Sequence, residues 1–203
     1  MIRWTLPALL LVCAAGCQVT PRVADPVRYY DFGIPRPAEE RSACARRLAL
    51  DKVAYAPMLA RETMWYREGG ASVEPRAFAI SRWSAPPGAL LEQHMRVALG
   101  VAESDRRAAL PFRLSLKLET MEQIFVDDRT SEARLTVSAA LTAEPEGRLV
   151  DSRVFSFAEA ADQRSPGGGA RAMARLVRSL GDQLRVWSCS SIAGDNNAPD
   201  SGL

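Results

Sequence analysis

Residues 131–157, SEARLTVSAALTAEPEGRLVDSRVFSF, decide the fold of this chain. Apolar residues occupy six successive odd-numbered positions within 133–143, and mostly polar residues separate them. Such alternation predicts a β-strand with one buried face. The Pro-Glu-Gly sequence at 145–147 then predicts a turn, and residues 149–157 predict the returning strand of a hairpin.

Two amphipathic helices and a further strand flank this hairpin. Residues 114–118 alternate in the same way and predict another long strand. Pro86 and Pro87 predict the start of a helix, because the first helical turn tolerates proline. The apolar face of that helix is formed by Leu91, Met95, Ala98 and Leu99. A flexible glycine-rich link at 165–169 precedes a final helix. Its apolar stripe is formed by Met173, Leu176, Val177, Leu180, Leu184 and Trp187.

The earlier part of the chain supplies shorter elements. Residues 29–33 predict a first strand or a docking segment, and residues 47–55 predict a strand. Residues 62–67 and 72–76 predict a hairpin around a Glu-Gly-Gly turn. The expected fold is α/β, a single-domain sandwich over residues 29–193 in which two main helices pack on a mixed, mainly antiparallel sheet.

The first seventeen residues have the features of a lipoprotein signal peptide. Arg3 supplies a positive charge, and the mainly apolar region of nine residues at 4–12 is too short to span a membrane. The small residues Ala-Ala-Gly at 14–16 precede Cys17, similar to a lipobox in which alanine stands where leucine is commoner. We expect residues 1–16 to be the signal peptide and Cys17 to be acylated. An ordinary secretory signal is the alternative.

Acylation of Cys17 would fix the protein stably to a membrane. Residues 17–28 contain two prolines and few apolar residues, which predicts an extended tether. Gln18 stands where aspartate resembles an inner-membrane retention signal in many diderm bacteria. We therefore expect the protein in the outer membrane, facing the periplasm. Residues 194–203 predict a polar, disordered tail.

Composition excludes several classes of function. The 26 basic and 24 acidic residues give a net charge of +2, which excludes a strongly basic nucleic-acid binder. His94 is the single histidine, which excludes a metal site formed by several histidines. No serine lies in the nucleophile-elbow pattern of hydrolases. The sequence therefore predicts a protein that is not an enzyme, without a metal or cofactor.

Two cysteines remain besides Cys17 in the mature chain. Cys44 lies near the start of the expected domain and Cys189 near its end. In an oxidising compartment such a pair predicts a disulfide that closes a loop of about 145 residues. Two buried free thiols are the alternative.

The order of these features resembles the auxiliary lipoproteins of ABC-type transport systems, of which the PqiC-like proteins are a branch. The resemblance covers residues 29–188. Its early motifs are the lipobox at Cys17, Tyr30-Asp31-Phe32-Gly33, the strand at 48–55 and Met64-Trp65-Tyr66-Arg67. Its later motifs are Phe78-Ala-Ile-Ser-Arg82-Trp83 before an amphipathic helix, a strand hairpin, an alanine-rich helix and Trp187. The resemblance gives Tyr30, Phe32, Gly33, Tyr66, Arg67, Arg82 and Trp83 a structural or interaction role.

The resemblance implies a non-enzymatic component of an envelope lipid-transport system. In such systems an ABC permease and ATPase work with an MCE-domain protein that bridges the periplasm. The lipoprotein would dock this partner at the outer membrane, alone or as a homo-oligomer, with phospholipid as a further candidate ligand. The alternative is a structural or assembly lipoprotein that braces another outer-membrane or cell-wall complex.

Overall fold

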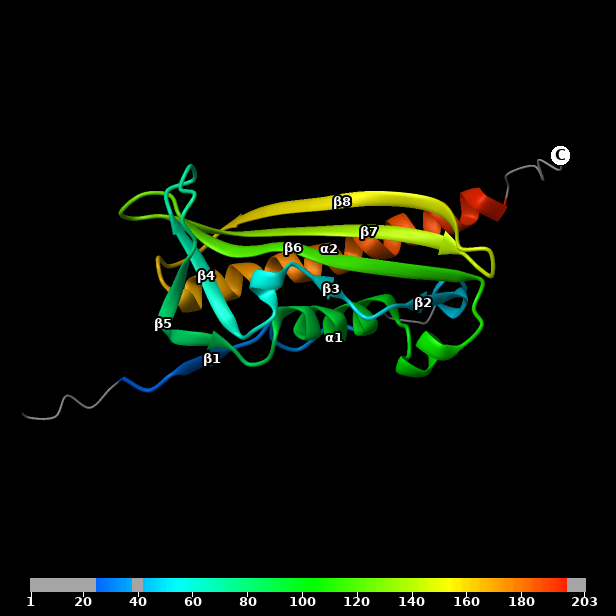
Figure 1. The fold of residues 1–203 in the computed structure, drawn as a ribbon, viewed down its shortest axis with the longest axis horizontal. Coiled ribbons are helices and arrows are strands. Elements are labelled where there is room, and N and C mark those ends of the chain that lie inside the picture. The colour runs from blue at the N-terminus through cyan, green and yellow to red at the C-terminus, as the bar shows by residue number, and fades with distance from the viewer. Residues whose placement is uncertain (1–24, 38–41, 197–203) are drawn as a thin grey trace, which may run out of the picture.

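The structure, a computed structural model, describes residues 25–37 and 42–196. These residues form one mixed eight-stranded sheet with two α-helices packed on it, which confirms the predicted fold class (Figure 1). The strands are β1 (Arg28–Tyr30), β2 (Leu48–Leu50), β3 (Ala54–Tyr55), β4 (Thr63–Glu68), β5 (Arg76–Trp83), β6 (Phe112–Phe125), β7 (Ser131–Ala143) and β8 (Arg148–Ala160). The helices are α1 (Pro87–Leu99) and α2 (Pro166–Asn196), and short 3-10 turns span Ala45–Arg47, Pro57–Leu59 and Glu103–Arg107.

The sheet follows the order β1-β5-β4-β6-β7-β8. The long strands β6, β7 and β8 are antiparallel, as the predicted hairpin requires. On its other side, β6 pairs in parallel with β2 and β3 along its first half and with β4 at its end. β1 pairs in parallel with β5 at the far edge. β6 therefore joins the short N-terminal strands to the long hairpin.

A β-bulge divides β6 between Leu118 and Thr120. The buried positions are even-numbered up to Leu118, and the row continues on odd numbers from Met121. An extra residue in one strand shifts its side-chain alternation in this way. The bulge explains why the alternation in the sequence predicted only residues 114–118 of a strand that runs to Phe125.

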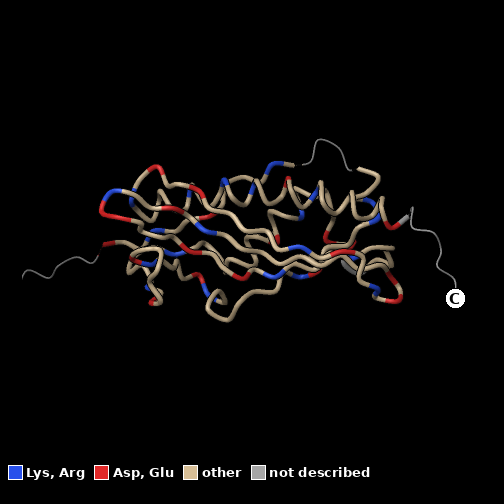
Figure 2. Tube along the Cα trace, turned by 90° about the horizontal axis from the view of Figure 1, so that it is seen from above, with Lys and Arg blue, Asp and Glu red and all other residues tan. Residues whose placement is uncertain are grey.

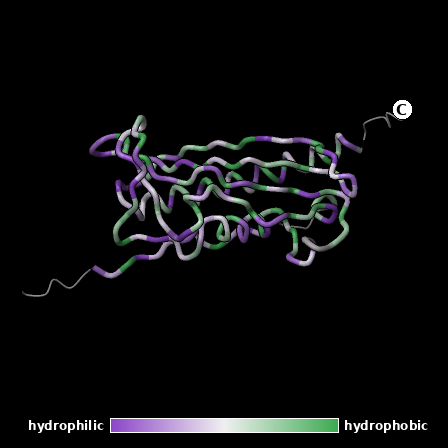
Figure 3. Tube along the Cα trace, viewed as in Figure 1, coloured by the Kyte–Doolittle hydropathy of each residue, from purple (hydrophilic) through white to green (hydrophobic). Residues whose placement is uncertain are grey.

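The core lies between the sheet and α2, which runs along β7 and β8 behind the long strands in Figure 1. The odd-numbered side chains of β7 from Ala133 to Leu141 are buried, and the even-numbered ones are partly exposed. Figure 3 shows hydrophobic and hydrophilic residues interleaved along the strands. The apolar stripe predicted for the last helix is buried against this row, as Met173, Leu176, Val177, Leu180, Leu184 and Trp187.

Two short segments near the start of the domain differ from their predictions. The expected strand at 47–55 is broken into β2 and β3, with residues 51–53 between them. The expected hairpin forms, but its second strand is β5, which begins at Arg76 where the predicted strand ends. Both segments lie beside longer strands. Pairing with those strands, and not the pattern of apolar residues in the segment itself, determines where each short strand begins and ends.

The glycine-rich sequence at 167–169 is not the flexible link that the sequence predicts. Helix α2 begins at Pro166 and includes all three glycines. A Cβ at Gly168 would overlap the carbonyl of Gln163, and a Cβ at Gly169 would overlap the side-chain amide of Gln123. Gly169 therefore allows the first turn of α2 to approach β6 closely, and Gly168 allows the backbone at Gln163 to pack against the same turn. At its other end α2 continues to Asn196, so residues 194–196 of the expected tail are helical.

We predict that Gly169→Ala lowers the free energy of unfolding by about 1–3 kcal/mol, because the added methyl group overpacks the contact with Gln123. The buried Gln123 amide cannot move away without losing its hydrogen bonds to Ser131 Oγ and the Ser165 carbonyl. Gly167→Ala is the matched control, since its Cβ would lie 3.5 Å from the Tyr30 ring, an ordinary contact. Urea unfolding of both variants measures the difference. Equal stability of the two variants would contradict close packing at Gly169.

A disulfide joins Cys44, beside the first 3-10 turn, to Cys189 in α2. Their Cα atoms are 5.5 Å apart, within the range that a disulfide requires, and 145 residues separate them in sequence. The bond links the start of the domain to the last turns of α2. Cross-linking so distant a pair restricts the unfolded chain strongly.

We predict that the double variant Cys44→Ala, Cys189→Ala is less stable than the parent by up to about 5 kcal/mol. The unfolded chain regains the loop entropy that the bond removes, and the start of the domain loses its link to α2. Chemical unfolding of the parent, with and without a reducing agent, provides the comparison. An unchanged unfolding midpoint in both comparisons would show that the bond adds no stability.

Candidate functional site

The N-terminal segment that leads from the expected anchor is packed into the core. β1 lies beside β5 with Tyr30 in register with Trp83, and Tyr30 accepts a hydrogen bond from the Ser84 N–H at 2.7 Å. Phe32 is only 2% exposed. Its ring packs edge-on against Trp83, with centroids 5.2 Å apart, and against His94 at 5.4 Å. We call Tyr30, Phe32, Gly33, Trp83 and His94 the anchor clasp.

Hydrogen bonds close the anchor clasp on the side of α1. Gly33 has a φ of +74°, a conformation that glycine adopts readily, and its N–H donates to Asp31 Oδ1 at 2.8 Å. The Gly33 carbonyl lies 3.0 Å from His94 Nε2, and the Leu90 carbonyl lies 3.1 Å from His94 Nδ1. Both ring nitrogens of this buried histidine thus face backbone oxygens. His94 holds the segment to α1.

Tyr66 belongs to a second aromatic group. Its ring lies 4.5 Å from that of Phe78 and 5.3 Å from that of Phe125, between centroids. The Arg164 guanidinium covers the Phe125 ring at 4.2 Å and pairs with Glu68 at 3.3 Å. The motifs in the sequence include Tyr66 and Phe78 but not Phe125 or Arg164. Phe125 lies at the end of β6 and Arg164 just before α2, so both are far from β4 in the sequence and no local pattern connects them to it.

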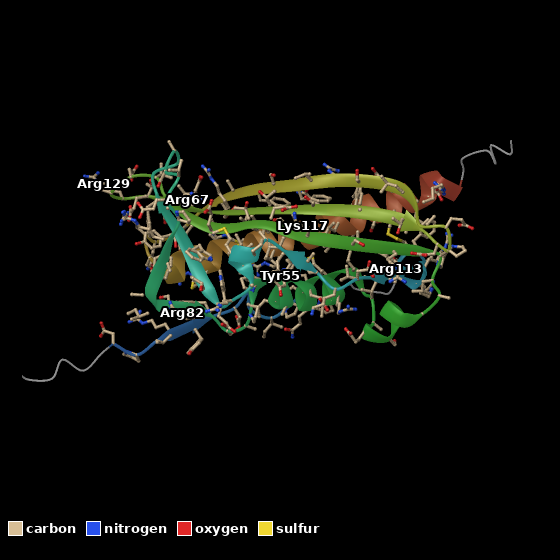
Figure 4. All side chains as sticks on the ribbon, viewed as in Figure 1. Tyr55, Arg67, Arg82, Arg113, Lys117 and Arg129 are labelled. Atoms are coloured by element: carbon tan, nitrogen blue, oxygen red, sulfur yellow. A yellow bond between two sulfur atoms is a disulfide. The ribbon has the colours of Figure 1, made fainter. Side chains whose placement is uncertain are left out.

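The two motif arginines bond to separate sets of partners and not to each other. Arg67 Nε donates to Glu122 Oε2 at 2.7 Å, and its Nη1 donates to the Ser72 carbonyl at 3.1 Å. Arg82 Nη1 donates to the carbonyls of Phe78 and Ser81 on its own strand. Figure 4 shows them at separate points of β4 and β5. The structure therefore brings Tyr30, Phe32, Gly33 and Trp83 together, and leaves Tyr66, Arg67 and Arg82 outside that group.

A polar contact that the sequence did not single out joins β8 to α2. Asp151 Oδ2 accepts hydrogen bonds from Trp187 Nε1 at 2.7 Å and from the Ser191 hydroxyl at 2.6 Å. These bonds, the Ser191 bond first, hold the pKa of the Asp151 carboxyl below its usual value. The alternation of residues 149–157 could have indicated this contact, because it places Asp151 on the inner face with the apolar residues.

β1, where the anchor clasp begins, lies toward one end of an elongated molecule. In Figure 1, β1 lies at the same end as the β4–β5 and β6–β7 turns, and α2 ends at the opposite end. Cys17 itself lies outside the described residues. Eight residue steps separate it from Asp25, the first described residue.

Charges of both signs are mixed over the described surface. Figure 2 shows basic and acidic residues interspersed along the trace. Many are paired, as in the contacts of Arg113 with Asp51 at 2.7 Å and with Glu144 at 3.2 Å. The Asp127 side chain accepts the N–H groups of Arg129 and Thr130, which lowers the pKa of Asp127. This pattern does not form a single-sign surface that would select a strongly charged ligand.

The hollows of the described region are shallow or very small. A groove of about 220 Å³ lies between α1 and α2, beside residues 35–37. Another, of about 500 Å³, lies over the outer face of β6, β7 and β8. A cavity of about 10 Å³ beside Gln123 and Trp83 has room for about one water molecule. In residues 25–37 and 42–196, no three His, Cys, Asp or Glu side chains are grouped so as to hold a metal ion. No helix in this part of the chain is long and apolar enough to cross a membrane.

Comparisons with known proteins identify the family of this architecture. The family model described as "ABC-type transport auxiliary lipoprotein component" matches residues 30–185. The crystal structure of a Xanthomonas campestris protein of the DUF330 family is 18% identical, with a TM-score of 0.66, and the match covers 85% of this chain and 98% of that one. A second crystal structure, of an uncharacterized protein, is 14% identical with a TM-score of 0.64, covering 79% and 97%. Both show the same fold. No curated protein matches the chain.

We predict that Phe32→Ala lowers the free energy of unfolding by about 3–5 kcal/mol, because it empties a ring-sized volume between Trp83 and His94. Ile34→Ala is the matched control two residues away, since Ile34 is 92% exposed. Thermal and urea unfolding of the two variants measure the effect. A loss at Phe32 no larger than that at Ile34 would show that the segment is not part of the core.

Proposed function

The chain belongs to the family of ABC-type transport auxiliary lipoprotein components, and on this premise we propose that it is a non-enzymatic, lipid-anchored part of an envelope lipid-transport system. Acyl chains on Cys17 would hold it at the outer membrane, on the periplasmic side. Its domain would dock the MCE-domain protein that bridges the periplasm from the ABC permease and ATPase.

The observation that carries this proposal is the anchor clasp. A docking protein must hold its partner at a defined place relative to the membrane, and a tether alone does not define one. Phe32 is enclosed by Trp83 and His94, so the tether enters the domain at a fixed point of the core. The family match begins at Tyr30, the residue at which this packing starts.

The arrangement of His94 supports a role without catalysis. Its two ring nitrogens lie within 3.1 Å of the Leu90 and Gly33 carbonyls, so neither is directed at a substrate site. A general base must have a nitrogen within reach of the proton that it removes. The mixed surface charges likewise favour a protein partner recognised through shape and hydrogen bonds over a strongly charged ligand.

We predict that covalent crosslinking in intact cells, followed by affinity purification of the full chain and mass spectrometry, recovers an MCE-domain protein. Cys17→Ala should abolish this recovery, because the unanchored protein no longer remains at the membrane. Density separation of the membranes should place the parent in the outer membrane and the variant in the soluble periplasmic fraction.

One control variant and two contrary outcomes make the experiment decisive. Ile34→Ala keeps the anchor and the fold and should behave as the parent, since its side chain is exposed. Recovery of an outer-membrane assembly or cell-wall complex, without an MCE-domain protein, would replace docking by a bracing role. Detection of the parent in the inner membrane would overturn the proposed location.

A further inference from the structure

β8 is the last strand of the sheet, and its outer edge is open at the middle. The Ala161 N–H just after β8 donates to the Ser131 carbonyl of β7 at 2.8 Å. In an antiparallel pair, successive residues direct their N–H and C=O groups alternately toward and away from the neighbouring strand. The odd-numbered residues of β8 therefore bond to β7. The even-numbered residues direct their backbone groups away from it.

Both ends of this edge are closed by polar side chains. The Ser152 N–H donates to Asp151 Oδ1 at 2.7 Å, and the Asp151 carboxylate is itself held by α2. At the other end, Arg175 Nη2 of α2 donates to the Ala160 carbonyl at 3.0 Å. These two bonds fit the expected alternation, because both residues are even-numbered.

Between the two closed ends lies what we call the edge window, residues 153–159. Val154, Ser156 and Ala158 are exposed, and their N–H and C=O groups point out of the sheet. Their side chains are small and uncharged, and no described residue bonds to these backbone groups. Sheet edges are commonly protected by charges, prolines or bulges that prevent pairing with another strand. The edge window has none of these on its open residues.

The sequence of the edge window is complementary to itself in the antiparallel direction. Ser156 lies midway between the closed ends at Ser152 and Ala160. If Ser156 pairs with Ser156 of a second copy, then Arg153 faces Glu159 and Phe155 faces Phe157 across the junction. Opposite charges and aromatic pairs are favourable cross-strand neighbours. We propose that the edge window binds a second copy of this chain about a two-fold axis through Ser156.

Other registers lack this complementarity. Sliding the second copy by two residues in one direction places Arg153 opposite Ala161, and in the other it places Asp151 opposite Glu159. Parallel pairing in register would place Arg153 beside Arg153. A shift of one residue would turn each inner side chain to the outer face. Only the register centred on Ser156 pairs both charges with their opposites.

The present surroundings of the two charged residues leave them able to form this contact. Glu159 Oε1 accepts from Arg175 Nε at 2.8 Å, and its side chain is still 39% exposed. Arg153 lies over its own Phe155 ring at 5.1 Å and is exposed. A carboxylate has acceptor positions for two guanidinium groups. The pair would therefore add to the Arg175 contact without replacing it.

Charge reversal tests the register. The full chain, purified in detergent, should self-associate in analytical ultracentrifugation. Arg153→Glu or Glu159→Arg should each weaken this association by about tenfold or more, because both symmetric pairs become repulsive. Mixing the two single variants should restore association as a mixed dimer, in which both pairs have opposite charges again. If the mixture associates, the two variants are folded, and misfolding is excluded as the reason why each of them alone fails to associate.

A cysteine on the proposed axis provides a second test. Ser156→Cys should form an intermolecular disulfide under mild oxidation, since paired Cα atoms there lie about 5.5 Å apart. Ser138→Cys, on the same outer face but on β7, is the matched control and should stay monomeric on a non-reducing gel, as should the parent.

A monomeric parent without crosslinking at residue 156 would overturn the proposal. Association that survives both charge reversals would also overturn it, because it would use another surface. These measurements contain no transport partner, so their failure would leave the proposed transport role standing.

Discussion

The burial of one row of β7 side chains beneath α2 is the constraint on which the rest of the structure depends. Leu135, Val137 and Leu141 are fully enclosed, and each such side chain contributes about 1.5–3 kcal/mol on leaving water. β7 pairs with β6 and β8 along nearly its whole length, so this row also fixes the register of both neighbours. A helix of 31 residues, α2, covers it.

The contacts of α2 also determine which parts of the sheet are covered by other residues and which are open to another strand. The first turn of α2 packs on Gln123 through Gly169, and its last turns hold the start of the domain through Cys189. Arg175 and the partners of Asp151 fix the two ends of β8. The middle of β8 receives nothing from α2 beyond packing on its inner face. The open part of the sheet is thus a consequence of where α2 makes polar contacts.

The sequence was most informative where one period ran unbroken. The alternation of 133–143 predicted β7, and the turn at 145–147 predicted its pairing with β8. The helical spacing of residues 173–187 predicted the buried stripe of α2, and these elements together predicted the fold class. Prediction failed where contacts distant in sequence decided the outcome. The bulge after Leu118 interrupts the alternation of β6. Gly169 lies in a helix, where Gln123 of β6 fills the space that a larger side chain would need. The resemblance marked Arg67 and Tyr66, but their partners Glu122 and Phe125 lie on a strand that local pattern did not reach.

The anchor and the edge window together constrain how the protein can lie at a membrane. β8 runs along the long axis, and β1 lies at one end of that axis (Figure 1). An antiparallel pair of copies would carry its two anchors at opposite ends. Both anchors can enter one membrane only if the long axis lies parallel to the membrane and the two-fold axis along its normal. One sheet face or the helices would then face the periplasm as a continuous surface, twice the width that a single copy offers to a partner.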